Sequence, residues 1–172
     1  MTQELIDLRT SILEERYEDA LAIVEDLEGM SRQAILRNIQ SFLLRLLIHL
    51  IKNQVEQRLT TSWVASISDS IRQIKRLNLQ DNKKAYYVKA DAWELMLEEE
   101  WEAAIDTASA EVMSGAYTPY QLLEMVDKTQ IMLTAQKLLY LTYEHSVKSL
   151  PAIVKEQIVQ LPGGEAWKSG KR

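Results

Sequence analysis

His49 is the side chain of this sequence best suited to acid–base chemistry or to binding a ligand. It stands at the edge of an apolar segment, with Arg45 and Asn53 one helical turn to either side. An imidazole in such a place can serve as a general base or as a ligand. It can also be a structural residue whose nitrogens are satisfied by hydrogen bonds, and we favour this second interpretation.

The residue types that bind metals do not occur at the spacing of a metal site. The second histidine, His145, directly follows Glu144, and neither a His-x-x-x-His nor a Glu-x-x-His spacing occurs. The chain has no cysteine, which excludes disulfides, thiol nucleophiles and Cys-ligated zinc. No glycine-rich loop matches a nucleotide-binding motif. We therefore predict no cofactor.

Two clusters of carboxylates could in principle bind a divalent cation. One contains Glu25, Asp26 and Glu28, and the other lies within residues 98–102. Solvated helix faces commonly carry such clusters, so we interpret both as surface. Glu28, which precedes the basic central part of the chain, is kept as a candidate functional position.

Charge is unevenly distributed along the 172 residues, whose net charge is −5. Residues 1–30 hold nine acids and two bases, residues 31–90 hold three acids and eleven bases, and residues 91–127 hold ten acids and no base. We predict that the acidic segments pack against the basic one. A nucleic-acid-binding surface on residues 31–90 is the alternative, although no recognised motif accompanies it. The bases concerned are Arg32, Arg37, Arg45, Lys52, Arg58, Arg72, Lys75, Arg76, Lys83, Lys84 and Lys89.

Helices must position these side chains, because helix formers dominate and only five Gly and three Pro interrupt them. The longest apolar pattern predicts a helix over residues 32–55, with an apolar stripe so wide that more than one side must be covered. Its most apolar run, residues 42–51, contains Arg45 and His49 and is shorter than the ~20 residues of a membrane span. We predict a central core helix and no membrane association.

A second clear helix is predicted over residues 62–77. Its apolar residues follow Trp63 at steps of four, four, three and three, so they share one face. Trp63 beside several bases could mark a membrane-surface helix, but the regular stripe favours Trp63 in the core. With residues 32–55 this helix would form an antiparallel hairpin.

Caps and apolar stripes define the other elements. Gly29 is interpreted as a helix stop and Ser31 as the cap of the central helix. Asp81 is a plausible cap for the segment 83–114, which is compatible with one helix or two. The further predicted helices are residues 2–16, 18–27, 119–146 and 151–161.

The start at residue 119 has the strongest local signal. Thr118 can cap, Pro119 suits the first helical position, and Gln121 completes a capping box. Apolar residues cover much of the predicted helix 119–146, which indicates a second contact, within the subunit or between subunits.

These elements together predict an all-α fold: a single-domain bundle of about six or seven helices over residues 1–161, around a long central helix. Residues 162–172 are predicted to be a flexible tail, because Pro162 and two glycines begin it. The first seven residues lack the basic and apolar regions of a signal peptide, so the cytoplasm is the expected compartment.

Several short sequences resemble a known family. Leu-Glu-Gly-Met-Ser at 27–31 precedes the apolar helix with Leu-Ile-His-Leu-Ile-Lys at 47–52, and Ser-Trp-Val-Ala-Ser-Ile follows at 62–67. Residues 101–123 contain further similar stretches. Over about residues 17–123 the chain resembles the bacterial, mainly cyanobacterial, domain-of-unknown-function family numbered 29. The resemblance implies an all-helical fold, and supplies no catalytic residue, ligand or partner.

The sequence therefore predicts a non-catalytic helical protein-interaction module whose partner is a second copy or another protein. The excess apolar surface of residues 119–146 is its expected contact. A nucleic-acid-associated protein using residues 31–90 is the alternative, and an enzyme with a site near His49 is the third hypothesis. The candidate functional positions are His49, Arg45, Asn53, Trp63 and Glu28.

Overall fold

The computed structural model describes residues 2–80 and 85–170. These residues form eight α-helices and no strand beyond one isolated bridge between Leu79 and Tyr86, which confirms the predicted all-α class. The chain divides into two compact units, Met1–Asn38 and Ile39–Arg172, called here the N-terminal and C-terminal units. Two compact units can belong to one cooperative domain, so the predicted single domain over residues 1–161 stays a prediction.

The longest element is α2, Tyr17–Glu56, with 40 residues. It runs without a break through Gly29 and Ser31, so their prediction as a helix stop and a cap was wrong. An interior glycine costs a helix only about 1 kcal/mol relative to alanine. The residues on both sides of Gly29 are good helix formers, and one such cost does not end the helix.

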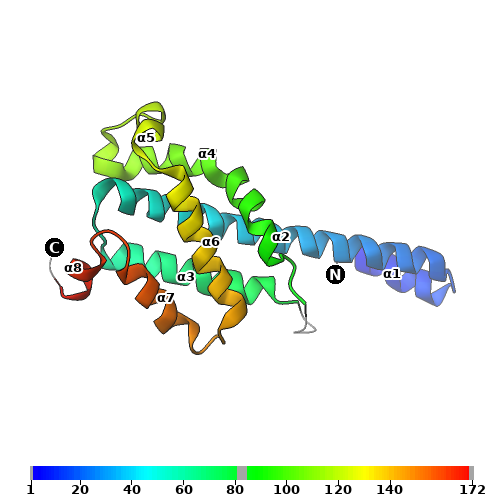
Figure 1. The fold of residues 1–172 in the computed structure, drawn as a ribbon. Coiled ribbons are helices and arrows are strands. Elements are labelled where there is room, and N and C mark those ends of the chain that lie inside the picture. The colour runs from blue at the N-terminus through cyan, green and yellow to red at the C-terminus, as the bar shows by residue number, and fades with distance from the viewer. Residues whose placement is uncertain (1, 81–84, 171–172) are drawn as a thin grey trace. The chain divides into compact units, whose positions relative to one another are not determined.

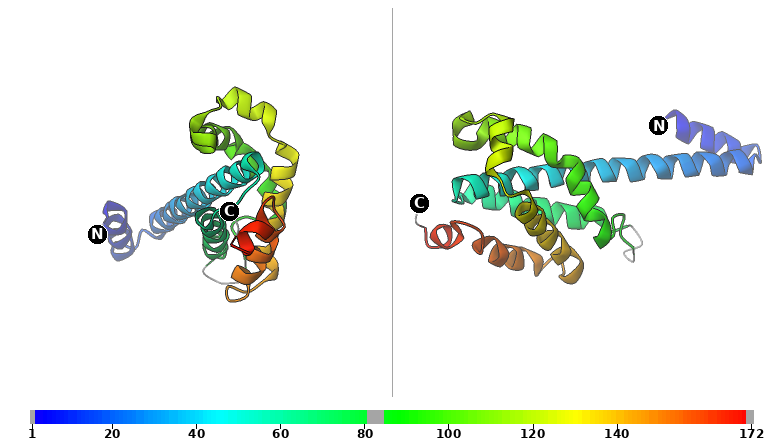
Figure 2. Two further views of the ribbon diagram at one scale, coloured as in Figure 1. Left: turned by 90° about the vertical axis from the view of Figure 1, so that its left-hand side faces the viewer. Right: turned by 45° about the horizontal axis from the view of Figure 1, so that its top comes forward.

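The N-terminal unit is a helical hairpin with almost no core. Helix α1, Gln3–Leu13, runs antiparallel to the first part of α2 (Figure 2). Its buried residues are Ser11 and Ala20, both small. The apolar residues Leu5, Ile12 and Leu21 of the predicted helices 2–16 and 18–27 would be expected to face inward, but they are exposed. That expectation is wrong because the described part of the unit has no third helix to cover them.

The C-terminal unit surrounds the last part of α2. In Figure 1 this part of α2 lies between α4 and α3, while α6 crosses over them and α7 runs beside α3. Short 3-10 turns at Ala90–Ala92 and Val112–Gly115 flank α4. The helices that follow α2 are α3 (Thr61–Asn78), α4 (Trp93–Glu111), α5 (Pro119–Met125), α6 (Lys128–Glu144), α7 (Leu150–Val159) and α8 (Gly164–Lys168).

The core of this unit follows the predicted apolar stripes. On α3, Trp63 is 8% exposed and the isoleucines at 67, 71 and 74 are fully buried, as predicted. The hydroxyl of Thr60 caps this helix by accepting from the backbone N–H of Trp63. The apolar residues of the segment 83–114 are also buried, and one helix, α4, carries most of them. That helix begins at Trp93 rather than at residue 83, and Asp81 lies outside the described residues.

The segment 119–146 is two helices where one was predicted. The capping box of Thr118 and Gln121 at its start is present as predicted. The helix breaks at Asp127, whose side chain accepts from the backbone N–H of Gln130 and caps α6. The side chain of Gln54 on α2 bonds to both the N–H and the C=O of Asp127, at 2.8 and 3.3 Å. Gln54 thus replaces the partner that the Asp127 N–H would have in a continuous helix, while the Asp127 C=O still accepts from the N–H of Ile131 in α6.

Helix α8 lies within the predicted tail at 162–172, whose flexibility stays a prediction. The tight turn before it requires glycine. Gly163 has φ +74°, and a Cβ there would lie 2.7 Å from the Cα of Arg58. The indole N–H of Trp167 donates to the hydroxyl of Thr61 at 3.2 Å, which links α8 to the start of α3.

Candidate functional site

The C-terminal end of α2 and the ends of α3 and α4 bring together a lysine, a tryptophan and a glutamate. Lys52 lies 3.0 Å from the carboxylate of Glu111, and its Nζ lies 4.8 Å from the ring centroid of Trp63. The Lys52 side chain is only 12% exposed. Its charge is therefore compensated twice, by a carboxylate and by the face of an indole.

Arg58 supplies a second cation to the same indole. Its Cζ lies 4.9 Å from the ring centroid of Trp63, and its Nε donates to the Glu56 carboxylate at 3.0 Å. Trp63 is buried in the core, as predicted, with its remaining surface beside two cations. The arrangement stabilises the α2–α3 connection and leaves no open face of the ring for a ligand.

His49, the leading catalytic candidate, is a half-buried neutral side chain. Its Nδ1 is buried without a hydrogen-bond partner. Burial, together with the positive charges of Lys52 and Arg45, lowers the pKa of His49 to about 4, although Glu111 opposes this shift. A base with this pKa is poorly matched to proton abstraction near neutral pH. The prediction that hydrogen bonds satisfy both ring nitrogens does not hold for Nδ1.

The two polar neighbours of His49 on α2 point to different partners. Arg45 forms a 3.4 Å ion pair with Asp69 of α3. Asn53 is buried and donates to the backbone oxygens of Arg58 and Pro162, at 3.1 and 2.8 Å. Asn53 thus links α2 to the α2–α3 loop and to the C-terminal segment by hydrogen bonds. The structure does not assemble these three residues into one polar site.

A buried polar network that the sequence did not indicate lies at the far end of α3. Asn78 pairs with both the N–H and the C=O of Val88, at 2.6 and 2.9 Å. The hydroxyl of Tyr143 donates to the same carbonyl and accepts from the indole N–H of Trp93. Burial raises the pKa of Tyr143. Because its members are hydrogen-bonded to one another, the network anchors residues 85–92 rather than presenting a reactive group.

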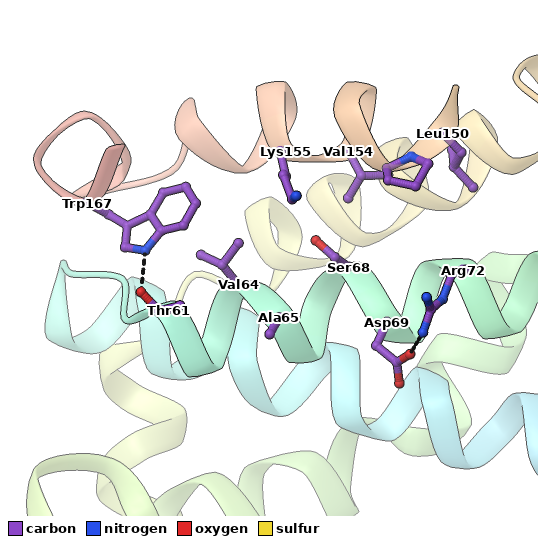
Figure 3. Close-up of a pocket in the computed structure, with 11 residues that line it drawn as sticks. Thr61, Val64, Ala65, Ser68, Asp69, Arg72, Leu150, Val154, Lys155 and Trp167 are labelled. Atoms are coloured by element: carbon purple, nitrogen blue, oxygen red, sulfur yellow. Dashed lines mark hydrogen bonds and ion pairs between the residues drawn. The ribbon is translucent and has the colours of Figure 1, made fainter. Parts of the chain in front are cut away.

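A cleft in the C-terminal unit lies between α3 and the pair α7–α8 (Figure 3). It encloses about 430 Å³. Apolar side chains such as Val64 and Val154 form its walls, and Trp167 closes one end. Lys155 and Ser68 point into it from opposite sides. None of these residues was a candidate from the sequence, because α7 and α8 are distant in the chain and only the fold brings them to α3.

Five of the bases that the structure describes in residues 31–90 have partners within the chain. Lys75 donates to the backbone oxygen of Thr142, and ion pairs engage the side chains of Arg45, Lys52, Arg58 and Arg72. Within the described ranges, the Lys52 pair is the one that joins the basic segment to the acidic segment 91–127. These pairs neutralise part of the basic segment, and nucleic-acid binding by residues 31–90 stays a prediction.

Glu28 lies on the N-terminal unit, away from the other candidates in the chain, and is exposed. One helical turn before it lie Val24 and Glu25, and one turn after it lies Arg32.

In the described part of the chain, no group of three or more His, Asp and Glu residues is placed to hold a metal ion. Among the described helices, α2 alone is long and apolar enough to cross a membrane, with a window of mean hydropathy 1.4 that is 33% buried. The core helix of a soluble protein meets the same criterion, and the absence of membrane association stays a prediction.

The family model for "Domain of unknown function DUF29" matches residues 5–151. The chain belongs to this family. The match is longer than the resemblance over 17–123, since it includes α1, α6 and the start of α7. No curated protein matches this DUF29 domain, and no solved structure does. Its cytoplasmic location and bacterial source stay predictions, and its function has to be argued from its own surfaces.

Proposed function

We propose that this DUF29 domain is a protein-interaction module whose α1–α2 hairpin docks a basic amphipathic helix of another protein. The observation that supports the proposal is the exposure of large apolar side chains on a hairpin without a core. Leu21 is 63% exposed, Tyr17 is 60% exposed and Ile12 is 51% exposed. A contiguous apolar surface of this kind is typical of an interaction site.

Exposed apolar residues of both helices lie on one side of the hairpin. A groove lined by Asp7, Thr10 and Asp19, together with Ile23, marks the opposite side. At 100° per residue, Leu5 and Ile12 on α1 turn away from that groove, as Tyr17 and Leu21 on α2 do. Both helices therefore contribute to one surface, called here the apolar side. It consists of Leu5, Leu8, Ile12, Tyr17, Leu21 and Val24.

Charge favours a basic partner over a second copy. Residues 1–38 hold nine acids and four bases, so the hairpin carries a net charge of −5. Arg16 is already paired with Glu14 and Asp19, at 2.9 Å each. By the same helical spacing Glu28 stands beside Leu21 and Val24, where it would meet a base on the partner. A second copy would place equal negative charges opposite one another, which disfavours association.

Several apolar residues of 119–146 are used within the chain, which is a further reason to place the interface on the hairpin. Ile131, Leu138 and Leu139 are buried where α6 packs against α3, α4 and α7. Leu133 and Tyr140 stay exposed on α6, at 62% and 41%, and Tyr120, Leu123 and Met125 stay exposed on α5. Unlike the hairpin, however, this segment also has a buried face that packs into the core.

The test uses a fluorescent synthetic helix of leucine and lysine, about 18 residues long, titrated with the full chain. We expect binding that weakens as salt rises, because screening reduces the attraction between the acidic hairpin and the basic peptide. Leu21→Ser should weaken binding roughly tenfold, the effect of losing one central apolar contact. The matched control is Leu133→Ser, since Leu133 has nearly the same exposure on the other unit. It should leave the affinity unchanged.

Two results would overturn the proposal. One is equal binding of a leucine–glutamate peptide, or an affinity that Leu21→Ser does not change. The other is a dimer in light scattering that Leu21→Ser dissociates, because a second copy would then occupy the apolar side.

A further inference from the structure

We propose that the cleft between α3, α7 and α8 binds a small amphipathic carboxylate, with its apolar body between the helices and its charged group at Lys155 and Ser68. This site belongs to the C-terminal unit. It is independent of the proposed hairpin interface, so either proposal can fail alone.

The walls of the cleft suit an apolar body. Val64 of α3 points towards Val154 of α7 across it (Figure 3), and Ala65, Leu150 and Pro151 also line it. Its volume of about 430 Å³ lies within the range of small-molecule sites. The cleft is apolar except for a few polar groups, which is how such sites combine affinity with orientation.

The charges at the cleft favour a negatively charged ligand. Lys155 forms no ion pair with any described residue, and its Nζ points into the cleft. Arg72 also lines the cleft but is paired with Asp69. Asp69 is in turn paired with Arg45 of α2. One carboxylate is thus shared by two arginines, so the surroundings of the cleft keep an excess of positive charge, and Lys155 is the lining cation that has no ion pair among the described residues.

A hydroxyl on the opposite wall completes the polar end. The Oγ of Ser68 is buried and has no hydrogen-bond partner. An unpartnered buried hydroxyl costs free energy unless a ligand or water satisfies it. Figure 3 shows Ser68 directed towards α7 in the part of the cleft that Lys155 enters. A carboxylate there could accept from both groups, since it has two oxygens.

Trp167 limits the cleft at its other end. Its indole N–H is held by the hydroxyl of Thr61, so the ring stands across the end of the groove. An apolar chain that extends from Lys155 along α7 would approach this ring. Trp167 is therefore the natural reporter for occupancy.

The experiment titrates octanoate into the ¹⁵N-labelled full chain and follows the four tryptophan indole N–H signals by NMR. We expect the Trp167 signal to shift as octanoate is added and to reach a plateau when the site is full. The signals of Trp63, Trp93 and Trp101 should stay constant, because these rings are buried elsewhere. Octanamide, with the same chain but no charge, should bind about fivefold more weakly, the size of one partly exposed charge interaction.

Three variants test the assigned contacts. Lys155→Met should weaken octanoate binding about fivefold, whereas Lys137→Met, which removes an exposed lysine of α6 outside the cleft, should have no effect. Ala65→Trp should block binding by filling the cleft, and circular dichroism must show that it stays helical. The proposal is overturned if octanoate does not shift Trp167, if octanamide binds equally well, or if Lys155→Met binds like the wild type.

Discussion

The two units of this DUF29 domain use the same kinds of apolar residue in opposite ways. In the C-terminal unit, Leu47 and Ile71 are fully buried among several helices. In the N-terminal unit, Leu21 and Leu13 are 63% and 73% exposed, although they too occur in regular helices. Helical periodicity thus places apolar residues on a face, but the number of neighbouring helices decides whether that face becomes core or surface.

Replacing a leucine by alanine should therefore lower the free energy of unfolding much more in the C-terminal unit than in the N-terminal unit. Leu47→Ala should lower the free energy of unfolding by about 2–5 kcal/mol, because it leaves a cavity in a packed core. Leu21→Ala should change it by less than about 0.5 kcal/mol, as is usual for exposed positions. Urea titration followed by circular dichroism measures both. Similar losses for the two variants would mean that Leu21 is covered in solution.

Gly163→Ala should have the next largest effect. The added Cβ would lie 2.7 Å from the Cα of Arg58 and 2.9 Å from the carbonyl oxygen of Gln57, and both are backbone atoms. We expect a loss of roughly 2 kcal/mol, from the clash and from the left-handed backbone of this residue. The same urea titration checks it. Unchanged stability would show that the turn at 161–164 does not pack against the α2–α3 loop.

The pH dependence of stability should also arise in the C-terminal unit, which holds both histidines. The pKa of His49 is about 4 in the folded chain, below its ordinary value of 6.5. Below pH 6.5 the unfolded chain therefore binds more protons, and stability should fall as pH drops from 6.5 towards 4. The expected loss is about 1–2 kcal/mol, since solvent screens a half-buried ring.

His49→Leu provides the control, because leucine keeps the apolar contacts and does not titrate. Urea titrations at pH 7.5 and pH 5 should show a smaller loss for this variant than for the wild type. Parallel pH profiles would contradict the assignment to His49.

The smallest predicted effect has the opposite sign and belongs to the N-terminal unit. Gly29 lies inside α2 with no atom near the position of a Cβ. Gly29→Ala should therefore stabilise the helix by about 0.5–1 kcal/mol. Amide hydrogen exchange over residues 21–33 should slow by the corresponding factor. Faster exchange would indicate that Gly29 has a role beyond the helix.

Patterns local in sequence predicted much of the fold. Trp63 and the isoleucines of α3 could be placed in the core, because their spacing leaves one continuous face. The capping box at Thr118 could be recognised because its bonds join residues three apart. The break at Asp127 was missed because Gln54 contributes to it from another helix, although the spacing of Asp127 and Gln130 resembles a cap.

The candidate sites were harder to predict than the helices. His49 and Asn53 could be singled out as polar residues in an apolar segment, but their partners depend on tertiary packing. Asn53 bonds to Pro162, which is 109 residues away. The cleft could not be anticipated, since Ser68 and Lys155 acquire a joint role only when α7 lies beside α3.

The hydrogen bond between Asn53 and Pro162 can form only late in the synthesis of the chain. Its two residues are separated by 109 positions, so a ribosome adding about 5–20 residues per second needs roughly 5–20 s between them. During that interval the amide of Asn53 must stay hydrated or take temporary partners. The last helices then complete the unit, and a nascent chain that stalls before Pro162 would expose the end of α2 to quality-control proteases.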